Sequence, residues 1–126
     1  MIVGLGIDVV EVARIRDSME RFGQAFINRI LTDTETREMN GLKHGKAAFA
    51  ASRWAAKEAA VKALGTGFSQ GIGFQDVEIE SLPSGEPKLR LHNEAAKHAE
   101  SRGINNTLVS ISHEKSVATA VVVMEM

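Results

Sequence analysis

Cysteine and tyrosine are absent from this 126-residue chain, and aromatic residues make up only 5% of it. Without cysteine there is no disulfide, no thiolate zinc site and no cysteine nucleophile, and a reducing compartment, by default the cytoplasm, is the expected location. The four histidines, at positions 44, 92, 98 and 113, lack zinc-ligand spacing. The scarcity of aromatic residues also disfavours an RNA-binding sheet, which presents exposed rings to bases.

Long apolar runs are also missing, and none approaches the roughly 20 residues that span a bilayer. The N-terminal stretch MIVGLGIDVVEVAR lacks a basic region and is interrupted by Asp8, so we expect a strand there rather than a signal peptide. We therefore expect no membrane partner. A net charge of −1 and a pI near 6.4 give no general attraction to nucleic acid, so an anionic partner must meet a local basic patch.

The composition is that of one globular domain over residues 1–126, with 44% hydrophobic and 25% charged residues. Residues 2–10 are apolar and β-branched, which predicts a buried strand. Apolar residues at helical spacing then predict a helix over 11–23, with Ile15, Met19 and Phe22 on its core-facing stripe. Thr32 and Asp33 offer an N-cap for a short helix that ends near Met39.

Residues 46–64 are rich in alanine, contain no proline or glycine and precede Gly65, so they predict a long helix. A glycine-rich loop over 65–73 follows it. Beyond this loop we expect strands near 77–82 and 88–91, a helix over 93–101, and strands over 108–112 and 117–124. This order predicts an α+β fold, with a mostly antiparallel sheet packed against the long central helix.

Charged residues in apolar surroundings are the first candidates for a functional site. Asp8 lies inside an apolar strand, where an unpaired carboxylate is costly to desolvate, so it either caps the following helix or binds a metal. Glu58 and Lys62 have the i,i+4 spacing of an ordinary surface ion pair. The many alanines around them suit a buried helix, so we expect Lys57, Glu58 and Lys62 to have specific partners. One carboxylate from a strand and one from a helix would suit Mg²⁺.

Three further features have both a functional and a structural interpretation. The loop over 65–73 is either a mobile connection or a phosphate cradle, but it follows the C-terminus of a helix, whose dipole repels anions. A phosphate there would depend on backbone amides, Lys62 and a metal. Arg14 and Arg21 share one helix face, which is either solvated or a dock for an acidic partner. His113, at a strand end, is in isolation more typical of a structural or exposed histidine.

Four segments together resemble bacterial holo-acyl-carrier-protein synthases in order and spacing over nearly the whole chain. They are GIDVVEVARI, FINRILTDTE, FAASRWAAKEAAVKALGTG and SISHEKSVATAVVV. The motif WAAKEAAVK with a following G-T-G is typical of 4′-phosphopantetheinyl transferases. The resemblance therefore implies the 4′-phosphopantetheinyl transferase fold.

The activity implied by this resemblance belongs to fatty acid biosynthesis. It is the Mg²⁺-dependent transfer of 4′-phosphopantetheine from coenzyme A to a serine of apo-acyl carrier protein, an acidic partner, with release of adenosine 3′,5′-bisphosphate. Mn²⁺ is the alternative ion. The alternative function is a catalytically inactive carrier-protein or coenzyme A binding module of the same fold, against which the intact Asp8, Glu58 and Lys62 argue.

The resemblance also implies roles for individual residues. Asp8 and Glu58 are expected to bind the metal and, with Lys62, to form the catalytic group. The expected coenzyme A contacts are Arg53, Lys62, Gly65, Thr66, Gly67, Ser84, Gly85, Pro87, Ile111, Ser112 and His113. Arg14 and Arg21 match the carrier-protein dock. The serine proton goes either to Glu58 or to a metal-bound hydroxide. A homotrimer is implied, with active sites at subunit interfaces where Arg53 or the dock comes from a neighbour.

Overall fold

The computed structural model describes residues 1–126. The first half of the chain forms β1 (Ile2–Glu11), α1 (Val12–Phe22), α2 (Gln24–Ile30), α3 (Asp33–Asn40) and α4 (Lys46–Leu64). The second half forms the short 3₁₀ helix η1 (Phe74–Asp76), β2 (Val77–Ser81), β3 (Pro87–Leu91), α5 (Asn93–Ser101), β4 (Asn106–His113) and β5 (Val117–Glu125). None of the helices combines the length and the apolar character that crossing a bilayer requires.

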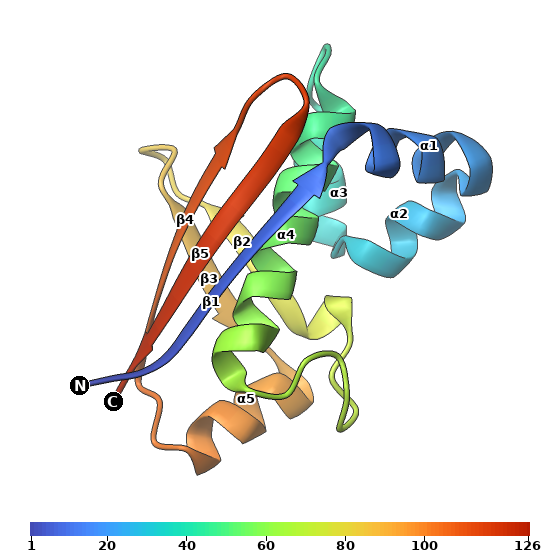
Figure 1. The fold of residues 1–126 in the computed structure, drawn as a ribbon. Coiled ribbons are helices and arrows are strands. Elements are labelled where there is room, and N and C mark those ends of the chain that lie inside the picture. Colours follow the sequence, from blue (N-terminus) through green and yellow to red (C-terminus); the bar gives the residue numbers. More distant parts are fainter.

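The strands form two antiparallel sheets, one with the order β1-β5-β4 and the other consisting of β2 and β3. Helix α4 packs against β1 and β5 and also contacts β2. Figure 1 shows α4 in green beside the three long strands, with the β2–β3 hairpin crossing behind them and α5 near the C-terminal end of α4. The predicted α+β fold with a central helix is confirmed. The division of the strands into two sheets was not predicted.

Helices α4 and α5 begin and end where the sequence predicted. Thr32 caps α3 as expected, in a capping box in which its backbone N–H donates to Glu35 and its hydroxyl accepts from the Glu35 N–H. Two expectations are wrong. The predicted buried strand β1 is buried on one face only, since Leu5, Ile7 and Val9 are 64–67% exposed. Phe22 does not face the core but is 58% exposed. The apolar surface that α1 buries against the core therefore becomes narrower towards the C-terminus of the helix, where Met19 is only partly buried.

Strand β1 lies directly on the backbone of α4. A Cβ atom added at Gly6 would come 1.9 Å from the carbonyl oxygen of Ala59, and one at Gly4 would come 2.2 Å from that of Ala63. The facing residues of α4 are alanines that are at most 3% exposed. Because neither element has large side chains at the contact, the strand approaches the helix more closely than a side chain at Gly4 or Gly6 would allow.

We expect Gly6→Ala to destabilise the protein by about 1–3 kcal/mol, because the added methyl group meets a helix carbonyl that cannot move independently. Urea unfolding measures the free energy of unfolding of the wild type and of each variant. Gly41→Ala is the matched control, since Gly41 has φ −76° and its added Cβ would lie 3.5 Å from the nearest atom. Equal effects of the two substitutions would contradict this account of the contact.

Candidate active site

Three charged residues meet where β1 crosses α4. The Lys62 Nζ donates to the Asp8 carboxylate at 3.2 Å and to the carbonyl of Ile7 at 2.9 Å. Burial raises the pKa of Glu58, the negative charge of Asp8 raises it further, and Lys62 opposes both effects. The i,i+4 pair predicted as one alternative for Glu58 and Lys62 is therefore not the ion pair observed, since Lys62 is paired with the strand carboxylate instead.

The donor set at this point fits a hard divalent cation. The chain has no cluster of three or more histidine, cysteine, aspartate or glutamate side chains that could hold a metal on its own. Asp8 and Glu58 offer oxygen ligands only, and burial and then the charge of Asp8 raise the pKa of Glu58. Mg²⁺ takes one or two protein carboxylates and fills its remaining positions with water and phosphate oxygens, so two carboxylates suffice.

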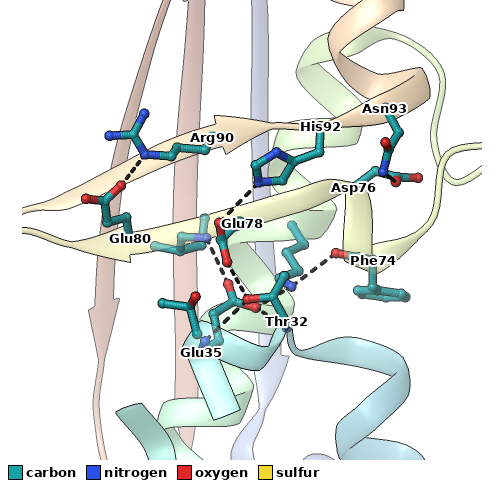
Figure 2. Close-up of polar contacts among 12 residues, drawn as sticks. Thr32, Glu35, Phe74, Asp76, Glu78, Glu80, Arg90, His92 and Asn93 are labelled. Atoms are coloured by element: carbon teal, nitrogen blue, oxygen red, sulfur yellow. Dashed lines mark hydrogen bonds and ion pairs between the residues drawn. The ribbon is translucent and has the colours of Figure 1, made fainter. Parts of the chain in front are cut away.

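Lys57, the residue before Glu58, has no part in this cluster. Its side chain is fully buried, and its Nζ donates to Glu35 at 2.6 Å, to the Ile30 carbonyl at 2.7 Å and to the Phe74 carbonyl at 3.1 Å. Glu35 also accepts from the Ile79 N–H at 2.8 Å. Burial lowers the pKa of Lys57, although Glu35 opposes the shift. Figure 2 shows these bonds converging between α3, α4, η1 and β2.

The same network continues to the surface. Glu78 on β2 belongs to it: its Oε2 accepts from the Thr32 hydroxyl at 2.6 Å, and its Oε1 lies 3.1 Å from the Nε2 of His92 (Figure 2). This network anchors α3 and the hairpin to α4. The sequence predicted that Lys57 has a specific partner but not which one, because Glu35 lies 22 positions away.

Arg53 lines a separate pocket of about 500 Å³. Its Nη2 donates to the Ser81 hydroxyl at 3.0 Å and lies 3.5 Å from a carboxylate oxygen of Glu38. The guanidinium stacks over Phe49, 4.2 Å from the ring centroid. Burial lowers the pKa of Arg53, and Glu38 opposes the shift. The Nε is buried and has no hydrogen-bond partner.

Five of the residues expected to contact coenzyme A lie around this pocket: Arg53, Gly85, Pro87, Ile111 and His113. His44, Phe49 and Ser81 also line it, and the sequence did not single them out. Ser84, in the β2–β3 turn, and Ser112 do not line it. Ser112 follows Ile111 on β4 and therefore points to the opposite face of the sheet, where it borders a smaller hollow with Ile7 and Thr119.

The Arg53 pocket and the carboxylate pair lie on different sides of α4. Asp8 and Ile111 occupy one cross-strand row, Asp8–Ala120–Ile111, at the two edges of the sheet. Their separation is about 10 Å, two strand spacings. Ala120, between them, is only 2% exposed, and α4 packs against its strand. The helix thus separates the two groups within one chain.

The remaining predicted site residues lie just after the C-terminus of α4 and on α1. The N–H groups of Gly65, Thr66 and Gly67 donate to the carbonyls of Lys62 and Val61, so these amides cap the helix. Arg14 and Arg21, on α1, have no carboxylate within 4 Å. Next to them, a hollow of about 370 Å³ is lined by Ser18, Phe22, Ala25, Phe26 and Arg29.

A family model described as the 4′-phosphopantetheinyl transferase superfamily matches residues 4–122. The chain belongs to this superfamily. Among curated members it is 51% identical to the holo-[acyl-carrier-protein] synthase of Desulfovibrio desulfuricans over 99% of this chain and 98% of the relative. It is 44% identical to the synthase of Vibrio atlanticus, over 98% of both chains.

Solved structures of the superfamily have the same fold. The holo-[acyl-carrier-protein] synthase of Neisseria meningitidis superposes with a TM-score of 0.91 at 37% identity, over 100% of both chains. The enzyme of Helicobacter pylori, crystallised in complex with coenzyme A, superposes with a TM-score of 0.84 at 32% identity, over 96% of this chain and 99% of that one. The predicted family is confirmed.

We expect Lys57→Met to destabilise this transferase-family chain by about 3–5 kcal/mol, because it leaves Glu35 charged and buried without its partner. Adding Glu35→Gln, which removes the charge and keeps an acceptor for one of the two backbone N–H groups that Glu35 binds, should recover part of the loss. Lys97→Met removes the exposed Glu94 pair and should cost at most about 1 kcal/mol. Urea unfolding of Lys57→Met, Glu35→Gln, the double variant and Lys97→Met measures the coupling; additive effects of the two buried substitutions would contradict it.

Proposed function

We propose that this chain transfers 4′-phosphopantetheine from coenzyme A to a serine of apo-acyl carrier protein, releasing adenosine 3′,5′-bisphosphate. The observation that carries the proposal is the meeting of Asp8, Glu58 and Lys62 at the β1–α4 contact, in a chain of this superfamily. In the reaction the serine hydroxyl gives up its proton to a base, for which Glu58 is a candidate, and the serine oxygen bonds to the phosphorus that bears pantetheine. The bond from that phosphorus to the bridging oxygen breaks, and the adenosine bisphosphate leaves.

Each group of side chains has a role in this reaction. Asp8 and Glu58 would hold Mg²⁺, which when bound would neutralise charge on the diphosphate of coenzyme A and on the phosphate that leaves with adenosine. Lys62, 52% exposed, lies beside the carboxylates and would orient the diphosphate. The pocket lined by Arg53 and His113 would bind the adenosine 3′-phosphate, because Arg53 brings a positive charge to it.

A homotrimer with active sites at subunit interfaces explains why the two halves of the site lie on different sides of α4. In support, the outer face of β1 carries Leu5, Ile7 and Val9, each 64–67% exposed. Leu5 lies in one cross-strand row with Val123 and Leu108, and Leu108 is 52% exposed. An apolar sheet face of this kind is typical of a subunit contact. We propose that Arg53 of one subunit completes the carboxylate site of its neighbour.

The direct test is to incubate the protein with coenzyme A, Mg²⁺ and an apo-acyl carrier protein and to measure the mass of the carrier. The carrier should gain one phosphopantetheine group, and chelation of the metal should prevent the gain. A carrier of unchanged mass in the presence of Mg²⁺ would rule out the transferase and favour a binding module without catalysis.

Glu58→Gln should abolish transfer without unfolding the protein. Because the folded state raises the pKa of Glu58, its ionised form destabilises the fold at neutral pH and its protonated form does not. With metal chelated, the variant should therefore be more stable than the wild type at pH 8, by roughly half a kcal/mol given the solvent exposure, and equal to it near pH 4. Retained transfer would contradict the metal assignment, and lower stability at pH 8 would contradict the sign of the pKa shift.

Arg14→Glu should raise the KM for the carrier protein about tenfold or more and leave the KM for coenzyme A unchanged, since Arg14 would contact an acidic partner. Lys97→Glu, with the same change in net charge on α5, is the control. Steady-state kinetics with each substrate varied in turn measure both KM values for Arg14→Glu and for Lys97→Glu. A selective rise in the KM for coenzyme A would remove the docking assignment.

A further inference from the structure

Helix α2 depends on other elements for its position. It has only seven residues, and a helix of this length is marginal on its own. Gly23, which joins it to α1, has φ 59° and provides no side-chain cap, so this joint does not fix the direction of α2. The position of the helix is therefore set by its buried side chains, Ile27 and Ile30, and by whatever holds its C-terminal end.

The C-terminal end of α2 is held by side chains from distant segments. The last four carbonyls of a helix have no partner within it. The Nε2 of Gln75, on η1, donates to the Asn28 carbonyl at 2.6 Å and also to the Leu31 carbonyl. The Nζ of Lys57 donates to the Ile30 carbonyl at 2.7 Å. Three of these four carbonyls are thus bonded to η1 or α4, and Gln75 alone binds two of them.

This end of α2 lies next to the hollow on α1. The helix supplies three of the five residues that line the hollow: Ala25, Phe26 and Arg29. Arg29 directly follows Asn28, so the bond from Gln75 lies within one residue of the hollow wall. No carboxylate lies within 4 Å of Arg29, which leaves its charge available to an acidic partner.

A row of aromatic rings connects the same two elements. The ring of Phe26 stacks on that of Trp54, with centroids 6.2 Å apart, and Trp54 contacts Phe74 at 4.7 Å. Phe74 precedes Gln75 on η1, so neighbouring residues of η1 act on α2, one through Trp54 and one directly. Gln75 itself is exposed, and its replacement therefore leaves no buried polar side chain without a partner.

We propose that Gln75 is a positioning residue for carrier-protein binding: it holds the C-terminal end of α2, and so keeps Phe26 and Arg29 in place beside α1. The proposal rests on the proposed function, because the acidic carrier protein is the partner of this surface. When a binding surface is correctly placed only part of the time, the apparent affinity falls by that fraction. The competing explanation is that Gln75 contributes to stability alone.

The test measures both KM values, kcat and the thermal unfolding temperature of Gln75→Met, which has a side chain of similar length without N–H groups. The KM for the carrier protein should rise about three- to tenfold, which corresponds to α2 being in place about a third to a tenth of the time. The KM for coenzyme A and kcat should stay within about twofold. Gln24→Met is the control, because it removes an exposed amide of α2 that binds the Asn28 side chain instead of a helix carbonyl. It should change neither KM.

A binding experiment without chemistry separates this proposal from the transferase function. The probe is an apo-carrier protein whose acceptor serine is replaced by alanine, titrated in the absence of coenzyme A. Its dissociation constant should rise in Gln75→Met by the same factor as the KM. Trp54, the one tryptophan of the chain, contacts α2 through Phe26, so its fluorescence should change in Gln75→Met and stay as in the wild type in Gln24→Met.

An active wild type with an unchanged KM for the carrier in Gln75→Met, or with equal rises in both KM values, would overturn the proposal and leave the transferase function intact. A wild type that transfers nothing would refute the transferase instead, and the titration with the serine-free carrier then decides about Gln75. If Gln75→Met fails to fold, Gln75→Asn decides, since its amide is too short to bridge both carbonyls. A raised KM for the carrier supports the proposal, and an unchanged one refutes it.

Discussion

The close contact between β1 and α4 determines where everything else in this protein lies. It exists because Gly4 and Gly6 face the helix backbone and because the helix presents alanines there. Asp8 follows two residues after Gly6, so the same contact carries its carboxylate to Lys62 and Glu58 on the helix. A site of two carboxylates and a lysine is thus a direct consequence of the absence of side chains at the preceding strand positions.

The second consequence of this packing is that α4 divides the site. On one side of α4, Glu58 and Lys62 meet Asp8 of β1. On the other side, Arg53 lines a pocket together with Ile111 and His113 of β4. Lys57, between Arg53 and Glu58 in sequence, is committed to Glu35 in the interior and fixes the rotation of the helix about its axis. The arrangement explains why one chain presents two half-sites instead of one cleft.

Much of this could be predicted from the sequence because the signals are local. The alanine-rich run that ends at Gly65 predicted α4 residue for residue, and Thr32 predicted the start of α3. Contacts between distant segments were not predictable, such as Lys57 with Glu35 or Gln75 with the end of α2. The alternation of side chains along β4 already separates Ile111 from Ser112, yet the family resemblance assigned both to one pocket. The exposure of Phe22 depends on the direction that α2 takes after α1. The spacing of apolar residues along α1 does not predict that direction.

The central claim, that one active site takes its carboxylates from one subunit and Arg53 from its neighbour, is tested most directly by complementation. Glu58→Gln and Arg53→Ala proteins, each inactive alone, are unfolded together, refolded at equal amounts and assayed for transfer to the carrier. Random reassortment in a cyclic trimer should restore about a quarter of the wild-type activity, since one interface in four then joins an intact Glu58 to an intact Arg53. A mixture no more active than its separate components would contradict the claim.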